Sequence, residues 1–233
     1  MNKVDFTYAE FLSNLQNNIA FSFARYGDGE WNAILGTKSK KKANCDGHKY
    51  FADMGQELGK ILKDCPDYIL GMQNLAMRQR GDEIQNFIKD LNLSWTNADI
   101  LHNASIKGKL FLLFNILKGL SDRIVIIGPY YLRDIKIKFD YKKFIEISEV
   151  DCWNDSDRIV NECAGILVGN PNMILLFSGS MAANVWIDRL YKHFGQYHSF
   201  IDCGSVWDPY IGQDKRSYHK QILAREAKQK KTS

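Results

Sequence analysis

The stretch LLFSGSMAANVWIDRLYKHFG, residues 175–195, contains one strand, one turn and one helix in succession. Its apolar run ends at Phe177, and Ser178-Gly179-Ser180 then opens an amphipathic helix over about 181–193. A solid apolar run, without alternating polar residues, is typical of a strand that is covered on both faces. This stretch therefore predicts a buried parallel strand whose following helix packs back against the sheet.

The same alternation extends in both directions along the chain. Parallel sheets flanked by helices produce this order of elements, so the sequence predicts an α/β fold with a mostly parallel sheet. The polar segment 36–50 breaks the pattern and is expected to be a long surface loop. The expected strands are 19–25, 68–72, 123–128, 144–148, 173–178 and 198–202, and the expected helices are 54–64, 82–91, 106–118, 155–168, 181–193 and 214–228.

Charge is distributed unevenly over the 233 residues. The net charge is +4, but from Lys215 onward the chain carries seven basic residues against Glu226 alone, which leaves the remainder slightly negative. A slightly acidic body argues against nucleic-acid binding, which depends on phosphate neutralisation. The basic tail is expected to be a solvated helix with a frayed end, and the alternative is peripheral contact with an anionic membrane.

Cysteine usage and the apolar runs indicate a cytoplasmic protein. The five cysteines are widely spaced and show no CxxC pair, as expected of reduced thiols. The N-terminus has no signal-peptide pattern. The longest apolar run, residues 110–117, is far shorter than the roughly 20 residues needed to cross a bilayer.

In open parallel sheets, ligands bind at the carboxyl ends of the strands, so polar residues there are candidates for chemistry. The first strand ends in RYGDGEW, residues 25–31, where Asp28 and Glu30 are one residue apart. Two close carboxylates repel each other unless a cation such as Mg²⁺ lies between them, and Arg25 could pair with a carboxylate or a phosphate. The alternative is that Asp28 caps a helix whose first turn contains Glu30.

Two later strand ends carry further candidates. Ser178, Gly179 and Ser180 could leave amide groups free for a phosphate, or a serine could simply cap the helix. Asp202 and Asp208 could each act as a general base, although Asp208 before Pro209 is also typical of a turn. The chain contains neither GxGxxG nor GxxxxGK[ST], so the usual dinucleotide and P-loop fingerprints are absent.

Taken in order, RYGDGE, IIGP at 126–129, SGSMAANVWIDRLYKHFG and IDCGSVWDPY resemble the GT-D-type glycosyltransferases, a family first catalogued as a domain of unknown function. The resemblance spans roughly residues 19–212. It implies a single Rossmann-like domain over 1–212, followed by a basic C-terminal helix or tail over 213–233. It also implies a DxE motif that holds a divalent metal against a nucleotide-sugar diphosphate. Near Gly204 the family often has a histidine, where this chain has Ser205, and this departure leaves the base open.

Carried over to this chain, the resemblance implies a metal-dependent hexosyl- or pentosyltransferase, and the presence of a candidate base favours inversion of configuration. Asp28 and Glu30 would hold Mn²⁺ or Mg²⁺, and Asp208 or Asp202 would be the base. The donor would be a UDP- or GDP-sugar and the acceptor a glycan or glycoprotein. Two alternatives stay open: a nucleotide-sugar or phosphosugar hydrolase on the same sheet, or a non-catalytic α/β binding module that uses the basic tail. The residues expected to bind the diphosphate are Arg25, Gly27, Ser178, Gly179 and Ser180.

Overall fold

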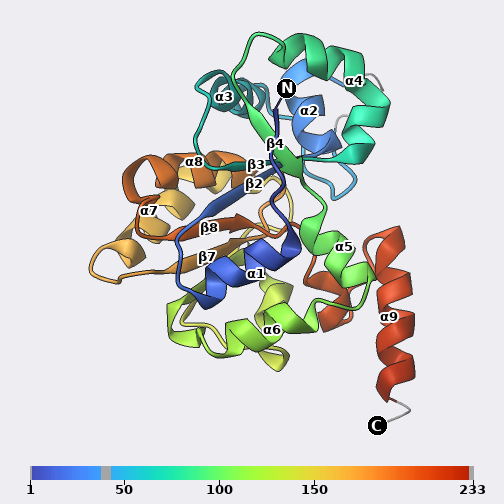
Figure 1. Ribbon diagram of the computed structural model, residues 1–233, viewed down its shortest axis with the longest axis vertical. Coiled ribbons are helices and arrows are strands. Elements are labelled where there is room, and N and C mark those ends of the chain that lie inside the picture. The colour runs from blue at the N-terminus through green and yellow to red at the C-terminus, as the bar shows by residue number, and fades with distance from the viewer. Residues whose placement is uncertain (1, 38–42, 231–233) are drawn as a thin grey trace.

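The structure, a computed structural model, describes residues 2–37 and 43–230, with side-chain detail for 3–37 and 43–225. One sheet runs through these residues in the spatial order β1-β4-β3-β2-β8-β7-β5-β6, and every neighbouring pair is parallel. Figure 1 shows its central strands, from β4 through β3, β2 and β8 to β7. This confirms the predicted α/β fold. The strands are β1 Asn2–Lys3, β2 Ser22–Tyr26, β3 Ile69–Met72, β4 Ser94–Asn97, β5 Ile124–Pro129, β6 Lys143–Ile147, β7 Ile174–Phe177 and β8 Ser199–Asp202.

Helices follow most strands and lie on both faces of the sheet. No helix within the described ranges is both long and apolar enough to cross a membrane. The α-helices are α1 Tyr8–Gln16, α2 Asp28–Leu35, α3 Ala52–Lys63, α4 Asn74–Ile88, α5 Ile100–Ile106, α6 Phe111–Lys118, α7 Ser156–Leu167, α8 Ala182–Phe194 and α9 Ser217–Lys230. The 3₁₀ helices are η1 Ser121–Arg123, η2 Tyr130–Ile137, η3 Cys152–Asp155 and η4 Asp208–Ile211.

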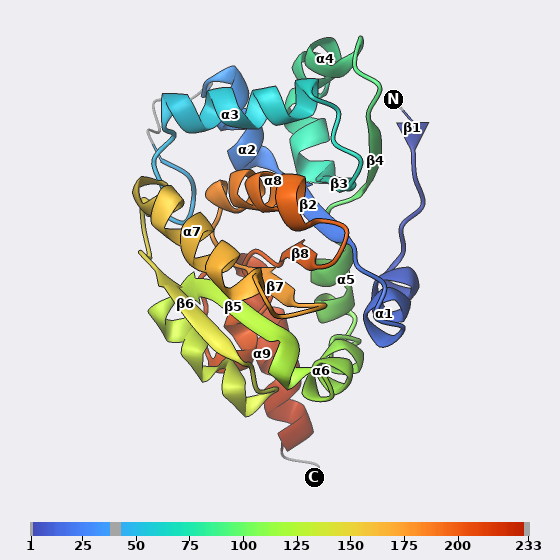
Figure 2. The same ribbon diagram turned by 90° about the vertical axis from the view of Figure 1, so that its left-hand side faces the viewer.

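The two faces of the sheet have separate hydrophobic cores, which explains the solid apolar runs in the sequence. Successive strand side chains point to opposite faces, so both faces of a doubly covered strand must be apolar. In β7, Leu175 and Phe177 pack toward α2, α3, α4, α7 and α8, whereas Ile174 and Leu176 pack toward α1, α5, α6 and α9. Figure 2 shows these two layers above and below the sheet.

Strand order reverses beside β2, at the centre of the sheet. β2 pairs with β3 on one side and with β8 on the other. From β2 the chain moves outward to β3 and β4, while β5 to β8 build the other half. The loops that leave β2 and β8 therefore diverge, and ligands of open α/β sheets bind at such a switch point.

The six predicted strands coincide with β2, β3, β5, β6, β7 and β8 to within a few residues, but several other predictions were wrong. No prediction covered β1, β4, α1 or most of α5, and α4 begins at Asn74 instead of at residue 82. A helix at α2 was expected only in the alternative that placed Glu30 in a first helical turn, and that part of the alternative is confirmed. The helix predicted over 106–118 begins only at Phe111, as α6, because α5 ends at Ile106 and Gly108 takes a left-handed φ of 70° between the two helices. In the loop predicted over 36–50, residues 38–42 lie outside the described residues, and Ala43 forms an isolated bridge with Lys49.

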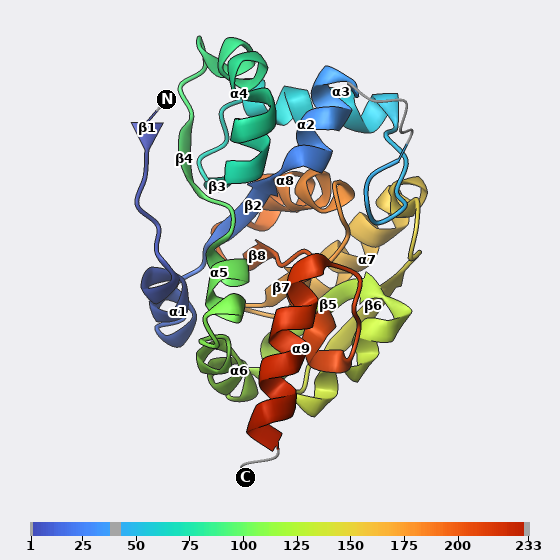
Figure 3. The same ribbon diagram turned by 90° about the vertical axis from the view of Figure 1, so that its right-hand side faces the viewer.

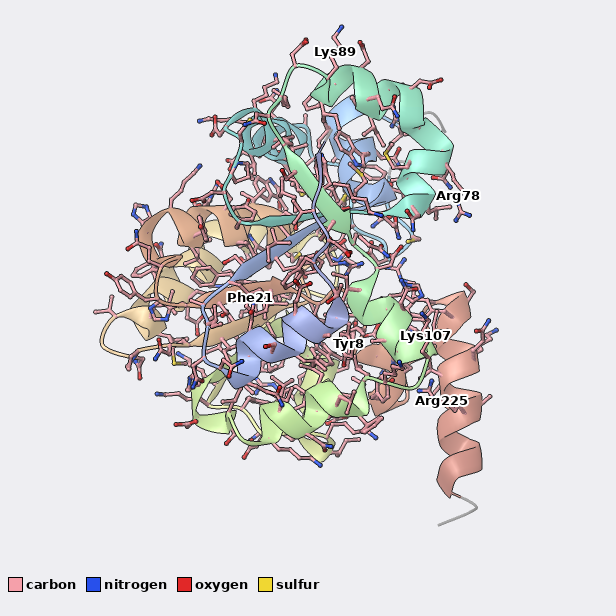
Figure 4. The ribbon with its side chains drawn as sticks, in the orientation of Figure 1. Tyr8, Phe21, Arg78, Lys89, Lys107 and Arg225 are labelled. Carbon is pink, nitrogen blue, oxygen red and sulfur yellow. The ribbon has the colours of Figure 1, made fainter. Side chains whose placement is uncertain are left out.

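Part of the C-terminal helix α9 packs against the body of the protein, so the helix is not solvated along its whole length. Arg225 donates hydrogen bonds from Nη1 to the carbonyl oxygens of Ser105 (2.7 Å) and Ile106 (3.0 Å), which are near the C-terminal end of α5 (Figure 4). A cation is favourable there because the last carbonyls of a helix lack intrahelical partners. α9 thus lies beside α5 at the carboxyl ends of the central strands (Figure 3).

Candidate active site

The carboxyl ends of β2, β7 and β8 bring the three predicted strand ends to one edge of the sheet. Gly27 follows β2, Ser178 follows β7 and Cys203 follows β8. β8 pairs with both β2 and β7, so the three ends are neighbours. Side chains that belong to stretches more than 150 residues apart in the sequence meet here.

Asp28 and Glu30 lie in the first turn of α2, which begins at Asp28. Gly27 is the N-cap, so the predicted alternative in which Asp28 caps the helix is wrong. Glu30 instead caps the helix, because its Oε2 accepts a hydrogen bond from the Gly27 amide at 2.8 Å. The Asp28 carboxylate is partly exposed and accepts no hydrogen bond from the described residues, while its amide donates to Gln73 Oε1 at 3.3 Å.

Glu30 is held in an environment that disfavours its charge. Burial raises the pKa of Glu30 to about 7, and the nearby Asp202 adds to the increase, while the Gly27 amide and Arg25 oppose it. The carboxylate that lies close to Glu30 is thus that of Asp202, across the switch point, and the sequence pattern had not paired these two. A bound cation would favour the ionised form of Glu30.

Arg25 is half-buried, and several carboxylates act on it through their charge. Its Nε donates to the Ala98 carbonyl at 3.0 Å. Burial lowers the pKa of Arg25, but the charges of Asp202, Asp99 and Glu30 more than compensate and raise it. Carboxylates therefore act on Arg25 through their charge, whereas its side-chain hydrogen bond goes to a backbone carbonyl.

Gly204 and Asn184 fix the position of Arg25. Asn184, in α8, donates from Nδ2 to the Arg25 carbonyl (2.7 Å) and accepts from the Arg25 amide at Oδ1 (3.2 Å). Gly204 has a left-handed φ of 53°, and a Cβ at that position would lie 2.3 Å from Arg25 Nη1. The sequence analysis identified neither contact, because both join residues that are distant in the sequence.

The turn Ser178-Gly179-Ser180 does not cap α8 as one alternative expected. The helix begins at Ala182, and its N-cap is Met181, which makes no side-chain capping bond. Gly179 lies against the ring of Trp186, where a Cβ would come within 2.3 Å of Cζ3. Ser180 takes a left-handed φ of 49° and donates from Oγ to Asp46 Oδ2 at 2.8 Å. This bond ties the turn to the loop around residue 46.

The two candidate bases lie at this edge in different surroundings. Asp202 is buried, which raises its pKa, and its Oδ1 accepts a hydrogen bond from the Gly204 amide at 2.9 Å. Asp208 is 3% exposed and begins η4, and burial raises its pKa to about 7 although Lys215 and Arg216 lower it. A carboxyl with a pKa near 7 matches the proton affinity that a general base needs at neutral pH.

Arg216 is a site residue that the sequence analysis counted only as part of a basic tail. Its Nη2 lies 3.3 Å from Asp46 Oδ2, the same oxygen that Ser180 contacts, and its Nη1 contacts Cys45 Sγ. Lys215 forms an ion pair with Glu149. The start of the tail therefore belongs to the edge of the sheet that carries the candidate site, and no local sequence signal distinguishes it from solvated lysines and arginines.

Comparison with known proteins rests on structure alone. No family model matches the chain, and no curated protein matches it. Three solved structures of domain of unknown function 1792 are similar over 90% of this chain and 80–83% of theirs, with TM-scores of 0.58–0.60 and 16–17% identity. One of the three is described as having a distinct glycosyltransferase fold, and another is a new glycosyltransferase from Streptococcus sanguinis. This chain has the DUF1792 glycosyltransferase fold.

The shared DUF1792 fold confirms the resemblance inferred from the sequence, including its single Rossmann-like α/β sheet.

The carboxylate oxygens at the switch point are suitable ligands for the divalent metal that the sequence motif implies. Among the described residues no three His, Cys, Asp or Glu side chains gather into a ready-made metal site. Mg²⁺ and similar ions often take only one or two protein carboxylates, with phosphate and water completing the shell. Asp28 is free of hydrogen bonds from the described residues, and Glu30 uses one oxygen for its amide contact, so both have acceptor capacity left.

Proposed function

We propose that this protein is a glycosyltransferase that moves a sugar from a nucleoside diphosphate donor to a hydroxyl of a glycan or glycoprotein acceptor. The observation that carries the proposal is the group of carboxylates at the switch point of a glycosyltransferase fold: Asp28 and Glu30 on one strand end, and a buried Asp208 with a pKa of about 7 on another.

Asp28 and Glu30 are the proposed holders of Mn²⁺ or Mg²⁺. Such an ion, when bound, would offset the negative charge that develops on a departing diphosphate. Asp28, at the start of α2, offers a carboxylate that accepts no hydrogen bond from the described residues, and Glu30 offers its second oxygen. Ionisation of Glu30, which burial opposes, would be favoured by the ion.

The diphosphate is proposed to lie between the first turn of α2 and the 178–180 turn. Gly27 provides backbone without a side chain at the end of β2, where a Cβ would lie 2.9 Å from Gln73 Oε1. Ser178, Gly179 and Ser180 end β7 on the other side of β8. The half-buried Arg25 is proposed to add positive potential near the diphosphate, because the charges of Asp202, Asp99 and Glu30 raise its pKa and keep its guanidinium protonated.

Asp208 is the proposed base, in preference to Asp202. A base must accept the proton of the acceptor hydroxyl if the reaction inverts configuration. Asp202 is committed to the Gly204 amide and to the charge of Arg25. The Asp208 carboxylate accepts no hydrogen bond from the described residues, and a pKa of about 7 allows it to gain a proton during the reaction.

A UDP- or GDP-sugar is the proposed donor, with a hexosyl or pentosyl group transferred. Membrane contact through the tail is a secondary proposal, and the structure narrows the residues available for it. Lys215, Arg216 and Arg225 contact the body of the protein. The other basic residues from 215 onward are the lysines at 220, 228, 230 and 231.

A panel of UDP- and GDP-sugars with Mn²⁺ tests the proposed function by the rate of donor turnover, with and without glycan acceptors. We expect turnover that EDTA abolishes and that Asp28→Ala reduces about 100-fold or more, as loss of a group that stabilises a developing charge does. Full activity of Asp28→Ala in excess EDTA would rule out the metal role. Steady sugar release that no acceptor changes would indicate the hydrolase alternative, and absence of nucleotide-sugar binding would favour the binding module.

A further inference from the structure

Arg216, Ser180 and Asp46 form a contact that the proposed mechanism does not use. They come from three separate parts of the chain: the start of the basic tail, the turn after β7 and the loop before α3. One oxygen of Asp46, Oδ2, accepts the Ser180 hydroxyl at 2.8 Å and lies 3.3 Å from Arg216 Nη2. A guanidinium and a hydroxyl that converge on one anionic oxygen make the kind of pair that binds phosphate oxygens in proteins.

The Asp46 carboxylate is itself only partly satisfied in this contact. Its second oxygen, Oδ1, is buried and has no hydrogen-bond partner among the described residues. A buried acceptor without a partner costs free energy, typically about 1–3 kcal/mol. An anion that brings several oxygens could replace Asp46 at Oδ2 and release the unsatisfied oxygen to solvent.

The surroundings place this contact in the candidate site. Ser180 belongs to the turn proposed to bind the diphosphate, and Gly179 of that turn accepts a hydrogen bond from Cys152 Sγ at 3.3 Å. Arg216 acts electrostatically on the proposed base Asp208 and on Tyr218. The contact therefore lies between the proposed diphosphate turn and the proposed base.

We propose that Arg216 and Ser180 form the binding seat for a phosphate group of the nucleoside diphosphate, and that Asp46 occupies this seat until the ligand displaces it. This inference rests on the proposed function, since it assigns a ligand to that same site. Asp46 is then an internal competitor that lowers apparent affinity, because only the fraction of molecules with a vacant seat can bind. Arg216 becomes a donor-binding residue, and Asp46 regulates access to it.

Isothermal titration with inorganic pyrophosphate in EDTA tests the seat without metal, sugar or catalysis. Asp46→Asn should bind pyrophosphate about fivefold to tenfold more tightly than the natural protein, since it removes the competing charge. Arg216→Gln should bind about tenfold or more weakly, because a hydrogen bond to a charged group is lost. In the double variant, Asp46→Asn should give no gain, because its effect acts through Arg216. Asp157→Asn, which removes the same charge from an exposed residue on α7, is the matched control and should change affinity less than twofold.

The outcomes separate the seat from the proposed function. Unchanged or weaker pyrophosphate binding by Asp46→Asn would show that Asp46 does not compete with the ligand. If Asp46→Asn raises the affinity equally with and without Arg216→Gln, Arg216 does not bind the ligand. Absence of binding by the natural protein overturns the seat. A parallel titration compares a nucleoside monophosphate with a nucleoside diphosphate. If the seat binds the diphosphate group of a nucleotide, Asp46→Asn should raise the affinity for the nucleoside diphosphate and leave that for the monophosphate unchanged. If sugar transfer is observed but every variant binds pyrophosphate as tightly as the natural protein does, the proposed function stands and the proposed phosphate-binding seat is wrong.

Discussion

At the scale of single residues, Glu30 has two roles that oppose each other. Its carboxylate caps α2 through the Gly27 amide, which stabilises the helix, yet burial and Asp202 raise its pKa to about 7. A residue chosen only for capping would lie in water, where its charge costs nothing. The combination is typical of sites in which a charged ligand completes the environment.

Glu30→Gln tests this balance through the pH dependence of stability. The pKa of Glu30 in the folded protein lies above its ordinary value of 4.5, so between pH 4.5 and pH 7 the folded state binds more protons than the unfolded chain. Its contribution to the free energy of unfolding therefore falls as pH rises through that window. Gln keeps an oxygen for the Gly27 amide but does not ionise, so the variant should gain about 3 kcal/mol on the natural protein between pH 4 and pH 8.

Urea unfolding of both proteins across this pH range measures the difference. Asp208 titrates in the same direction, but it is present in both proteins and cancels from the comparison. Glu30→Ala, which also loses the cap, should be less stable than Glu30→Gln by about 1 kcal/mol at every pH. A constant difference between Glu30→Gln and the natural protein would show that Glu30 is not held in a charge-disfavouring site.

At the scale of elements, the turn after β8 is built around Arg25. Gly204 takes a left-handed φ and leaves room for the guanidinium of Arg25. Gly212, after η4, is also left-handed, with a φ of 84°, but nothing lies within 4 Å of the place where its Cβ would be. Alanine substitutions at the two glycines can therefore distinguish the free-energy cost of the backbone conformation from the cost of displacing Arg25.

Gly204→Ala should therefore be more destabilising than Gly212→Ala. Alanine in a left-handed conformation costs about 1–2 kcal/mol at either position. At position 204 the new methyl group also forces Arg25 away from its acidic neighbours, which adds about 1–3 kcal/mol. Thermal and urea unfolding provide the free energies, and equal losses for the two variants would show that Arg25 adapts without cost.

The elements also show how far sequence patterns reach. The buried strands were predictable because solid apolar runs such as IVII in β5 have few other uses in a folded domain. The start of α2 stayed open between two interpretations, because Gly27-Asp28-Gly29-Glu30 fits both a turn and a helix start, and in the structure Glu30 lies in the first helical turn and accepts a bond from Gly27. The division between α5 and α6 depends on one φ angle at Gly108.

At the scale of the whole molecule, the candidate site is a product of topology. Strand order brings Asp28, Asp202 and Ser180 to one edge, which could be predicted from the rule that ligands bind at strand ends. The contacts within that edge could not be predicted, because Arg216 meets Asp46 across 170 residues and Asn184 meets Arg25 across 159. The sequence identified candidate acids, but the partners that set their charge states come from the assembled fold.

The account depends on a divalent cation at the start of α2, and the anomalous scattering of manganese tests this most directly. A crystal of the protein with Mn²⁺ and a nucleoside diphosphate should show one strong anomalous peak within coordination distance of the Asp28 and Glu30 carboxylates, with diphosphate oxygens on its other side. The peak should disappear in Asp28→Ala crystals prepared in the same way. A diphosphate bound at the sheet edge with no manganese near these carboxylates, or a peak that survives the substitution, would contradict the account.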